Sequence, residues 1–131
     1  IDKQAEKLNI VQDILLEVNL AGEASKSGFS PETVLAGARL AADLDHIRLR
    51  GLMCIPPIST KPGQNRPFFA NLRRLAVDIR QQMEDNKADI VCLSMGMSGD
   101  YSDAVAEGAT FVRLGTALFG PRPSIHPAGE S

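Results

Sequence analysis

The sequence has few of the features that mark nucleic-acid-binding or membrane proteins. Fourteen basic and sixteen acidic residues give a net charge of -2, so no basic excess is available to hold a phosphate backbone. No apolar run approaches the roughly 20 residues of a bilayer-spanning helix, and no signal-peptide pattern opens the chain. We therefore expect a cytoplasmic protein that binds neither nucleic acid nor membrane.

Cysteine and histidine are equally scarce. Cys54 and Cys92 each lie inside an apolar run rather than at a metal-binding spacing, so we expect buried, reduced thiols instead of a disulfide. The histidines, His46 and His126, stand apart from any group with metal-ligand spacing. No metal site is expected.

What the sequence does have is a regular alternation of two apolar patterns. Short β-branched runs predict strands, and apolar residues at helical spacing predict the helices between them. The predicted strands are residues 13–20, 47–55, 90–93 and 111–119. The predicted helices are residues 2–8, 31–42, 68–83 and 100–107. Connections of this length favour parallel pairing of neighbouring strands in an α/β fold.

Four parallel strands fit either a doubly wound sheet or part of a (β/α)₈ barrel of the TIM type. A complete barrel needs ~250 residues, so this chain would be about half of one. An isolated half-barrel would leave two strand edges unpaired. The barrel interpretation therefore implies further protein upstream, in keeping with a sequence that opens at Ile1, without methionine, in a charged helical pattern.

Small, hydrogen-bonding residues follow the last two predicted apolar runs. Ser94 and Thr116 offer hydroxyl groups, Gly96 and Gly115 allow close backbone approach, and Arg113 adds a fixed positive charge. Phosphate groups bind to such donors at the carboxyl ends of parallel strands. The same residues also suit a structural role, with glycines in turns, serines as helix caps and the arginine in a surface ion pair.

Four segments resemble the pyridoxal phosphate homeostasis proteins, the YggS/PROSC family. They are residues 17–29 (EVNLAGEASKSGF), 50–56 (RGLMCIP), 93–98 (LSMGMS) and 112–120 (VRLGTALFG). The segments occur in order and at fitting spacings over nearly the whole chain. That family is similar in fold to the barrel domain of alanine racemase, a fold-type III pyridoxal-phosphate protein.

The resemblance implies that residues 1–131 are the C-terminal half of a single cofactor-binding barrel, with residues 121–131 as a tail. Ser94, Gly115 and Thr116 would then hold the phosphate of pyridoxal 5′-phosphate, beside Gly96. Arg113 would lie near the pyridine nitrogen. A permanently charged guanidinium there discourages protonation of the ring and weakens it as an electron sink.

The sequence departs from the family pattern in two ways, and the second argues against catalysis. By the resemblance, the lysine that bonds the cofactor would lie upstream of every residue in this sequence. Alanine racemase also uses a tyrosine from a separate C-terminal domain as an acid/base. Here the only tyrosine is Tyr101, and because eleven residues follow Gly120 we expect no such domain.

The resemblance therefore implies a non-catalytic carrier that takes part in intracellular pyridoxal phosphate homeostasis. Its partners would be pyridoxal phosphate itself and the enzymes that use it, and we expect a monomer. Two alternatives stay open. One is an amino-acid racemase of the same fold, and the other is a barrel that binds a different phosphorylated metabolite.

Overall fold

The computed structural model of the chain describes residues 1–23, 27–83 and 88–121. Residues 24–26, 84–87 and 122–131 lie outside this description, so all but the first residue of the expected tail at 121–131 is untested.

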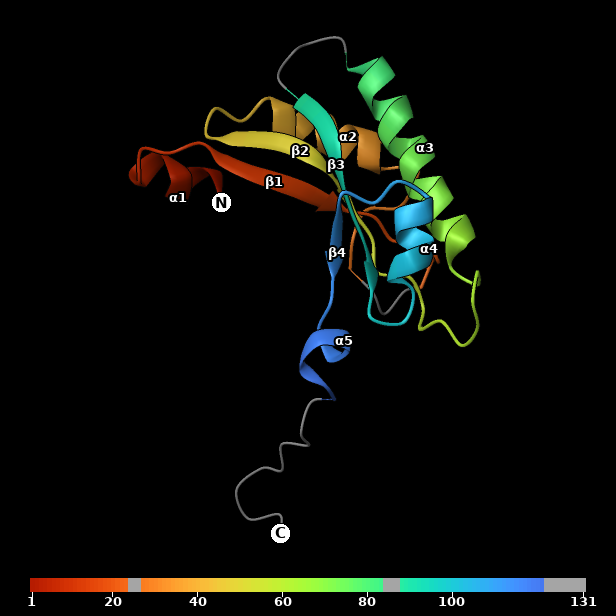
Figure 1. Cartoon of the computed structure of the whole chain (residues 1–131). Coiled ribbons are helices and arrows are strands. Elements are labelled where there is room, and N and C mark those ends of the chain that lie inside the picture. The colour runs from red at the N-terminus through yellow and green to blue at the C-terminus, as the bar shows by residue number, and fades with distance from the viewer. Residues whose placement is uncertain (24–26, 84–87, 122–131) are drawn as a thin grey trace.

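Four parallel strands form one sheet, in the same order as they occur along the chain (Figure 1). The strands are β1 (Gln12–Glu17), β2 (Ile47–Met53), β3 (Ala88–Met97) and β4 (Phe111–Arg113). The helices are α1 (Asp2–Lys7), α2 (Val34–Ala42), α3 (Arg66–Gln82), α4 (Tyr101–Ala106) and α5 (Thr116–Phe119). The predicted parallel α/β arrangement, with neighbouring strands adjacent in order, is confirmed.

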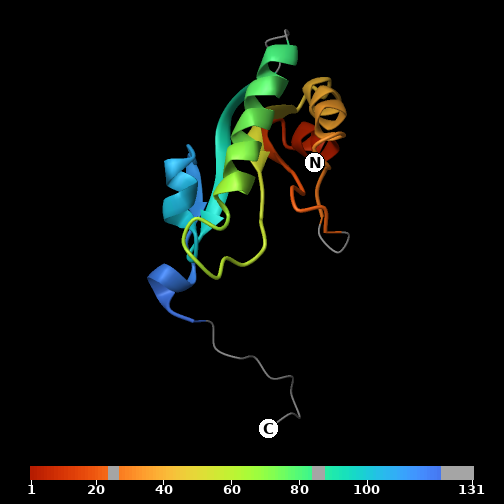
Figure 2. The same cartoon turned by 90° about the vertical axis from the view of Figure 1, so that its right-hand side faces the viewer.

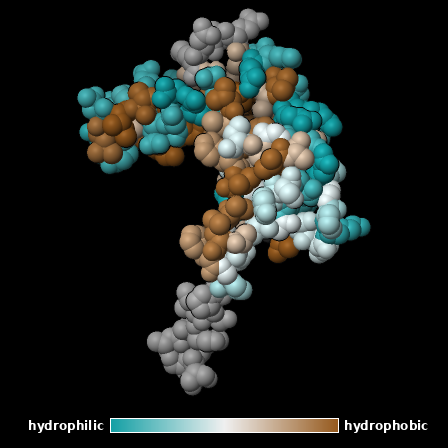
Figure 3. Space-filling model, viewed as in Figure 1, coloured by the Kyte–Doolittle hydropathy of each residue, from teal (hydrophilic) through white to brown (hydrophobic). Residues whose placement is uncertain are grey.

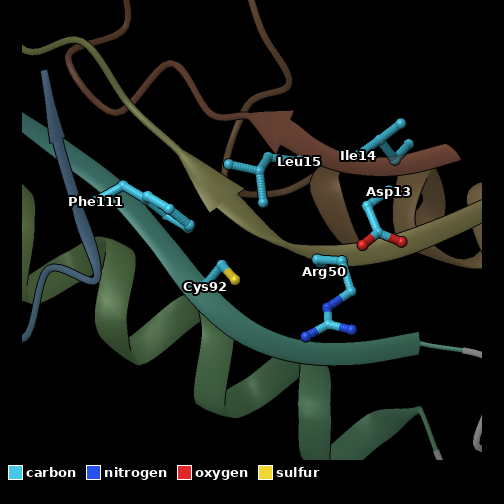
Figure 4. A pocket seen from close by; sticks show the side chains of 6 residues that line it. All are labelled: Asp13, Ile14, Leu15, Arg50, Cys92 and Phe111. Carbon is cyan, nitrogen blue, oxygen red and sulfur yellow. The ribbon is translucent and has the colours of Figure 1, made fainter.

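Helices α2, α3 and α4 all pack on one face of the sheet (Figure 2). The longest, α3, buries Phe69, Leu72, Ala76 and Ile79, which recur every three or four residues and so form one apolar stripe. This stripe packs into a single core with the buried residues of the strands. None of these helices covers the opposite face of the sheet, along which the strands lie open (Figure 4).

All four predicted strands end at a different residue in the structure. Those expected at residues 13–20 and 47–55 end early, at Glu17 and Met53. The strand expected at residues 111–119 ends at Arg113, because Gly115 leaves the extended conformation and α5 begins at Thr116. The strand expected at residues 90–93 continues to Met97, since its end pairs with Arg113 of β4. The sequence pattern had suggested that Arg113 and Gly115 share one strand, and in the structure they do not.

The pairing of β2 with β3 depends on a glycine. Against β1, Arg50 is an extra residue of β2 and forms a bulge, because the consecutive residues Ile14 and Leu15 pair with Leu49 and Gly51. The register against β3 also shifts between Leu49 and Gly51, and there the extra residues lie in β3. A Cβ atom on Gly51 would lie 1.8 Å from the carbonyl oxygen of Cys92. No side chain fits in that space, so the close approach of the two strands requires glycine.

Replacing Gly51 with alanine is expected to destabilise the fold strongly, because the clash is with backbone and cannot be relieved by a rotamer change. We expect a loss of about 3 kcal/mol in the free energy of unfolding, measured by denaturant titration. Gly99→Ala is the matched control, since a Cβ at Gly99 meets no atom within 4 Å. Equal stability of the two variants would contradict the assigned role of Gly51.

Cys54 follows β2 and lies in the core, with 1% of its surface exposed. Both cysteines are free thiols, as the sequence predicted, although Cys92 is only half-buried. Burial raises the pKa of the Cys54 thiol from 9.0 to about 12, against an opposing effect of the Arg113 charge. The thiol is therefore neutral at physiological pH.

This raised pKa makes the stability of the protein sensitive to alkaline pH. In the unfolded chain the thiol ionises near its ordinary pKa of 9.0. The contribution of Cys54 to the free energy of unfolding is therefore complete below pH 9.0 and is lost as the pH rises toward about 12. The slope from this group approaches about 1.4 kcal/mol per pH unit. Denaturant titrations across that range should show a shallower decline for Cys54→Ala than for the parent, and parallel curves would refute the assignment.

Candidate functional site

A cavity of about 500 Å³ lies at the carboxyl ends of three strands. Its walls are residues 55–59, which follow β2, and residues 97–100, which follow β3. Arg113, Gly115 and Thr116, at and after the end of β4, complete the lining. In parallel α/β folds this is the edge of the sheet where ligands bind.

Arg113 is the one basic side chain among the described residues that line this cavity. Its guanidinium reaches from β4 to the end of β2, where Nη2 donates a 2.6 Å hydrogen bond to the carbonyl oxygen of Cys54. The Nε atom is buried and has no hydrogen-bond partner among the described residues. The hydrogen bond to Cys54 thus holds the charge in place at the cavity.

Gly115 and Thr116 stand at the turn from β4 into α5. A Cβ atom on Gly115 would meet no atom within 4 Å, so the backbone here borders open space. The turn is held by Ser98, whose hydroxyl oxygen accepts a 2.9 Å hydrogen bond from the Ala117 N–H. A loop after β3 and a loop after β4 are thereby joined at the rim of the cavity.

The other two residues named from the sequence lie within β3 and do not line the cavity. Ser94 is 7% exposed and pairs with Met53 and Phe111 in the sheet. Gly96 has a φ of +98°, and a Cβ there would lie 2.6 Å from the Cβ of Ala104. Gly96 therefore permits α4 to pack on the strand, which is a structural reason for glycine at this position.

Two parts of the lining, residues 55–59 and residues 97–100, were not predicted as site residues. Ile55 was predicted to end a strand and Asp100 to begin a helix. Met97 and Ser98 were only part of the segment 93–98. The sequence did contain an indication that residues 55–59 belong to the site. Pro56 and Pro57 follow a predicted parallel strand, as Ser98 and Gly115 do. The carboxyl ends of neighbouring parallel strands lie at one edge, which brings these segments together.

A second hollow, of about 320 Å³, lies on the open face of the sheet (Figure 4). Asp13, Leu15, Arg50, Cys92 and Phe111 point into it from all four strands. The hydrogen bond from Arg48 lowers the pKa of the Asp13 carboxyl, so the hollow combines one carboxylate with the Arg50 guanidinium. This mixture of charge and apolar surface differs from the small, donor-rich rim at the strand ends.

The described residues contain no group of three or more histidine, cysteine, aspartate or glutamate side chains placed to hold a metal ion. Over the same residues, no helix has both the length and the apolar character needed to cross a bilayer.

Comparison with known proteins places the chain in a family. The model of the alanine racemase N-terminal domain matches residues 1–123. The pyridoxal phosphate homeostasis protein of Aquifex aeolicus is 47% identical over 122 residues, which cover 93% of this chain and 52% of that protein. Its counterpart from Pseudomonas aeruginosa is 45% identical over 116 residues, covering 88% of this chain and 47% of the relative. The chain thus spans about half the length of these curated relatives.

A solved structure gives the same result. PipY of Synechococcus elongatus, solved with pyridoxal phosphate bound, superposes with a TM-score of 0.79 at 35% sequence identity. The match covers 91% of this chain and 54% of PipY. The four parallel strands, with α2, α3 and α4 on one face of the sheet, agree with these matches. The chain belongs to the family of the alanine racemase N-terminal domain, in which it groups with pyridoxal phosphate homeostasis proteins.

Proposed function

We propose that this chain supplies the phosphate-and-ring end of a pyridoxal 5′-phosphate site, in a protein that holds the cofactor for intracellular homeostasis. The observation that carries the proposal is the cavity at the strand ends, on which Arg113, Gly115 and Thr116 converge. Relatives named pyridoxal phosphate homeostasis proteins, and a relative solved with that cofactor bound, support it.

The residues present fit an anionic ligand. Arg113 brings a permanent positive charge to the lining, and the space in front of Gly115 is open to backbone approach. The Thr116 hydroxyl adds a donor at the same rim. Phosphate oxygens accept hydrogen bonds from backbone N–H and hydroxyl groups, and the Arg113 charge attracts an anion to the cavity.

In this proposal each site residue has a distinct task. Gly115 and Thr116 would hold the phosphate, and Arg113 would lie near the ring nitrogen. Ser94, which the resemblance also assigns to the phosphate, and Gly96 lie in β3 outside the cavity lining. When bound, the cofactor supplies an electrophilic aldehyde and an electron-withdrawing ring. Arg113 keeps the ring nitrogen unprotonated because a second positive charge beside the guanidinium is unfavourable, which limits the activation of bound amino acids.

The racemase alternative finds no support at this cavity. A racemase needs a second acid/base near the ring, and among the described lining residues there is no tyrosine. Tyr101, the sole tyrosine of the sequence, lies on α4 and is 42% exposed. A binding role without racemisation agrees better with this arrangement.

We further infer that the remainder of a (β/α)₈ barrel covers the open face of the sheet, so that this chain is its second half. Figure 3 shows apolar surface along β4 and onto α5, where Phe111, Leu118 and Phe119 are each more than half exposed. An apolar strand edge in water promotes association. The relatives, at about twice this length, have the further residues that a closed barrel needs.

The phosphate assignment is tested by placing a carboxylate at Gly115. Gly115→Asp should weaken pyridoxal phosphate binding by about 2–4 kcal/mol, because the new charge repels the phosphate and the close backbone approach is lost. Its melting temperature should stay close to that of the parent, since the added side chain enters open space. Bound cofactor and melting temperature are both measured on the complete protein after stripping and reloading.

Gly115→Asn is the matched control for this variant, with the same size and no charge. It should lose less affinity than Gly115→Asp, and the difference between the two measures the charge term. If Gly115→Asp retains pyridoxal phosphate as well as the parent does, the phosphate binds elsewhere.

The barrel assignment is tested by comparing the 131-residue chain with the complete protein. The isolated chain should melt over a broad range and self-associate, because its open face and β4 edge are exposed, whereas the complete protein should melt sharply. Calorimetry with light scattering provides the measurement. A sharp two-state melt of the isolated chain as a monomer would rule out the dependence on further strands.

A further inference from the structure

Two helix N-cap residues meet in a buried hydrogen bond beneath the candidate cofactor cavity. Asn65 precedes α3 and Asp100 precedes α4, and they are 1% and 8% exposed. The Asn65 amide Nδ2 donates to Asp100 Oδ2 over 2.7 Å, although the residues are 35 positions apart in the chain.

Neither side chain performs the task that its position favours. Asparagine and aspartate at an N-cap normally accept a hydrogen bond from the first turn of their own helix. Here neither makes a side-chain cap hydrogen bond. Both side chains are turned away from their helices and toward the cavity walls, which points to a role other than helix capping.

Each member of the pair also holds one wall of the cavity. Asn65 Nδ2 donates a second hydrogen bond, of 2.8 Å, to the carbonyl oxygen of Pro57 in the wall formed by residues 55–59. Asp100 Oδ1 accepts a 2.8 Å hydrogen bond from the Met97 N–H in the wall formed by residues 97–100. The chain Pro57, Asn65, Asp100, Met97 therefore fixes the distance between the two walls.

The orientation of the Asn65 amide is set by its surroundings. Both of its partners are acceptors, so Nδ2 must face them, and Oδ1 is left buried without a hydrogen-bond partner among the described residues. Leaving a buried acceptor unpaired costs free energy. An apolar residue here would remove that unpaired oxygen, but it would leave the Pro57 carbonyl oxygen and Asp100 Oδ2 without this donor.

We propose that Asn65 is a positioning residue that sets the width of the cofactor cavity through Asp100. This role rests on the proposed function, because it concerns the same cavity. Asn65 itself does not line the cavity and touches no ligand; it acts by holding residues 55–59 against residues 97–100. Loss of the bridge lets the walls separate and weakens the grip on the bound molecule.

The chain offers a control at the other end of α4. Arg66 donates to the Glu107 carboxylate at 2.8 Å, and Arg73 pairs with it at 3.0 Å, so Glu107 also ties α3 to α4. The hydrogen bond from Arg66 lowers the pKa of Glu107, which is therefore ionised at neutral pH. None of these three residues lines the cavity.

The test compares Asn65→Ala, the milder Asp100→Asn, and the control Glu107→Gln in the complete protein. We would measure the dissociation constant for added pyridoxal 5′-phosphate, the circular dichroism of the bound cofactor and the melting temperature. Binding is measured at a temperature well below the melting transition of every variant. Asp100→Asn keeps the volume of the side chain but leaves one oxygen to accept from both Asn65 Nδ2 and the Met97 N–H. This variant therefore tests the bridge if Asn65→Ala does not fold.

We expect both bridge variants to raise the dissociation constant about tenfold and to change the circular dichroism of the bound cofactor. Glu107→Gln should lower the melting temperature and leave both binding readouts unchanged. Unchanged binding by the bridge variants, or an equal loss with Glu107→Gln, overturns the positioning role while the proposed function stands. Failure of the unaltered protein to bind pyridoxal phosphate overturns the proposed function and this role with it.

Discussion

Parallel pairing of four strands is the constraint from which the position of the candidate site follows. Because every strand points the same way, every carboxyl end lies at one edge of the sheet, and three loops meet there. The pairing itself depends on close approach at Gly51, where no side chain fits between β2 and β3. A shift of β3 at this point would move Met97, Ser98 and Asp100, and with them one wall of the cavity.

Long-range polar contacts then hold this edge together. Arg113 reaches the carbonyl oxygen of Cys54, Ser98 accepts from the Ala117 N–H, and Asn65 bridges to Asp100. Each contact joins loops that follow different strands or precede different helices. The bond from Asn65 to Asp100 is buried, that from Arg113 is partly buried and that to Ser98 is exposed. A hydrogen bond is stronger in a buried site than in water, so the first of them contributes most to the rigidity of this edge. The apolar core positions the strands, and these few hydrogen bonds position the loops in which binding residues lie.

The sequence predicted the strand order, the parallel pairing and the helices, because these depend on apolar periodicity that each segment carries by itself. It placed Arg113, Gly115 and Thr116 at one site, and the structure brings them to one cavity. It placed Ser94 and Gly96 beyond the end of β3, whereas pairing of Met97 with Arg113 extends the strand past both. Helix α5 was missed for a similar reason, since the hydroxyl that binds its first turn comes from Ser98, 19 residues earlier. Contacts between distant loops leave no periodic signal, so neither they nor the bridge from Asn65 to Asp100 could be read from the sequence.

The central claim is that the strand-end cavity, and not the hollow on the open face of the sheet, binds the cofactor phosphate. A crystal structure of the complete protein with pyridoxal 5′-phosphate tests this most directly. We expect phosphate oxygens within about 3 Å of the Gly115 backbone N–H and the Thr116 hydroxyl, with the ring toward Arg113. A phosphate bound instead at Arg50, in the hollow lined by Asp13 and Cys92, would contradict it.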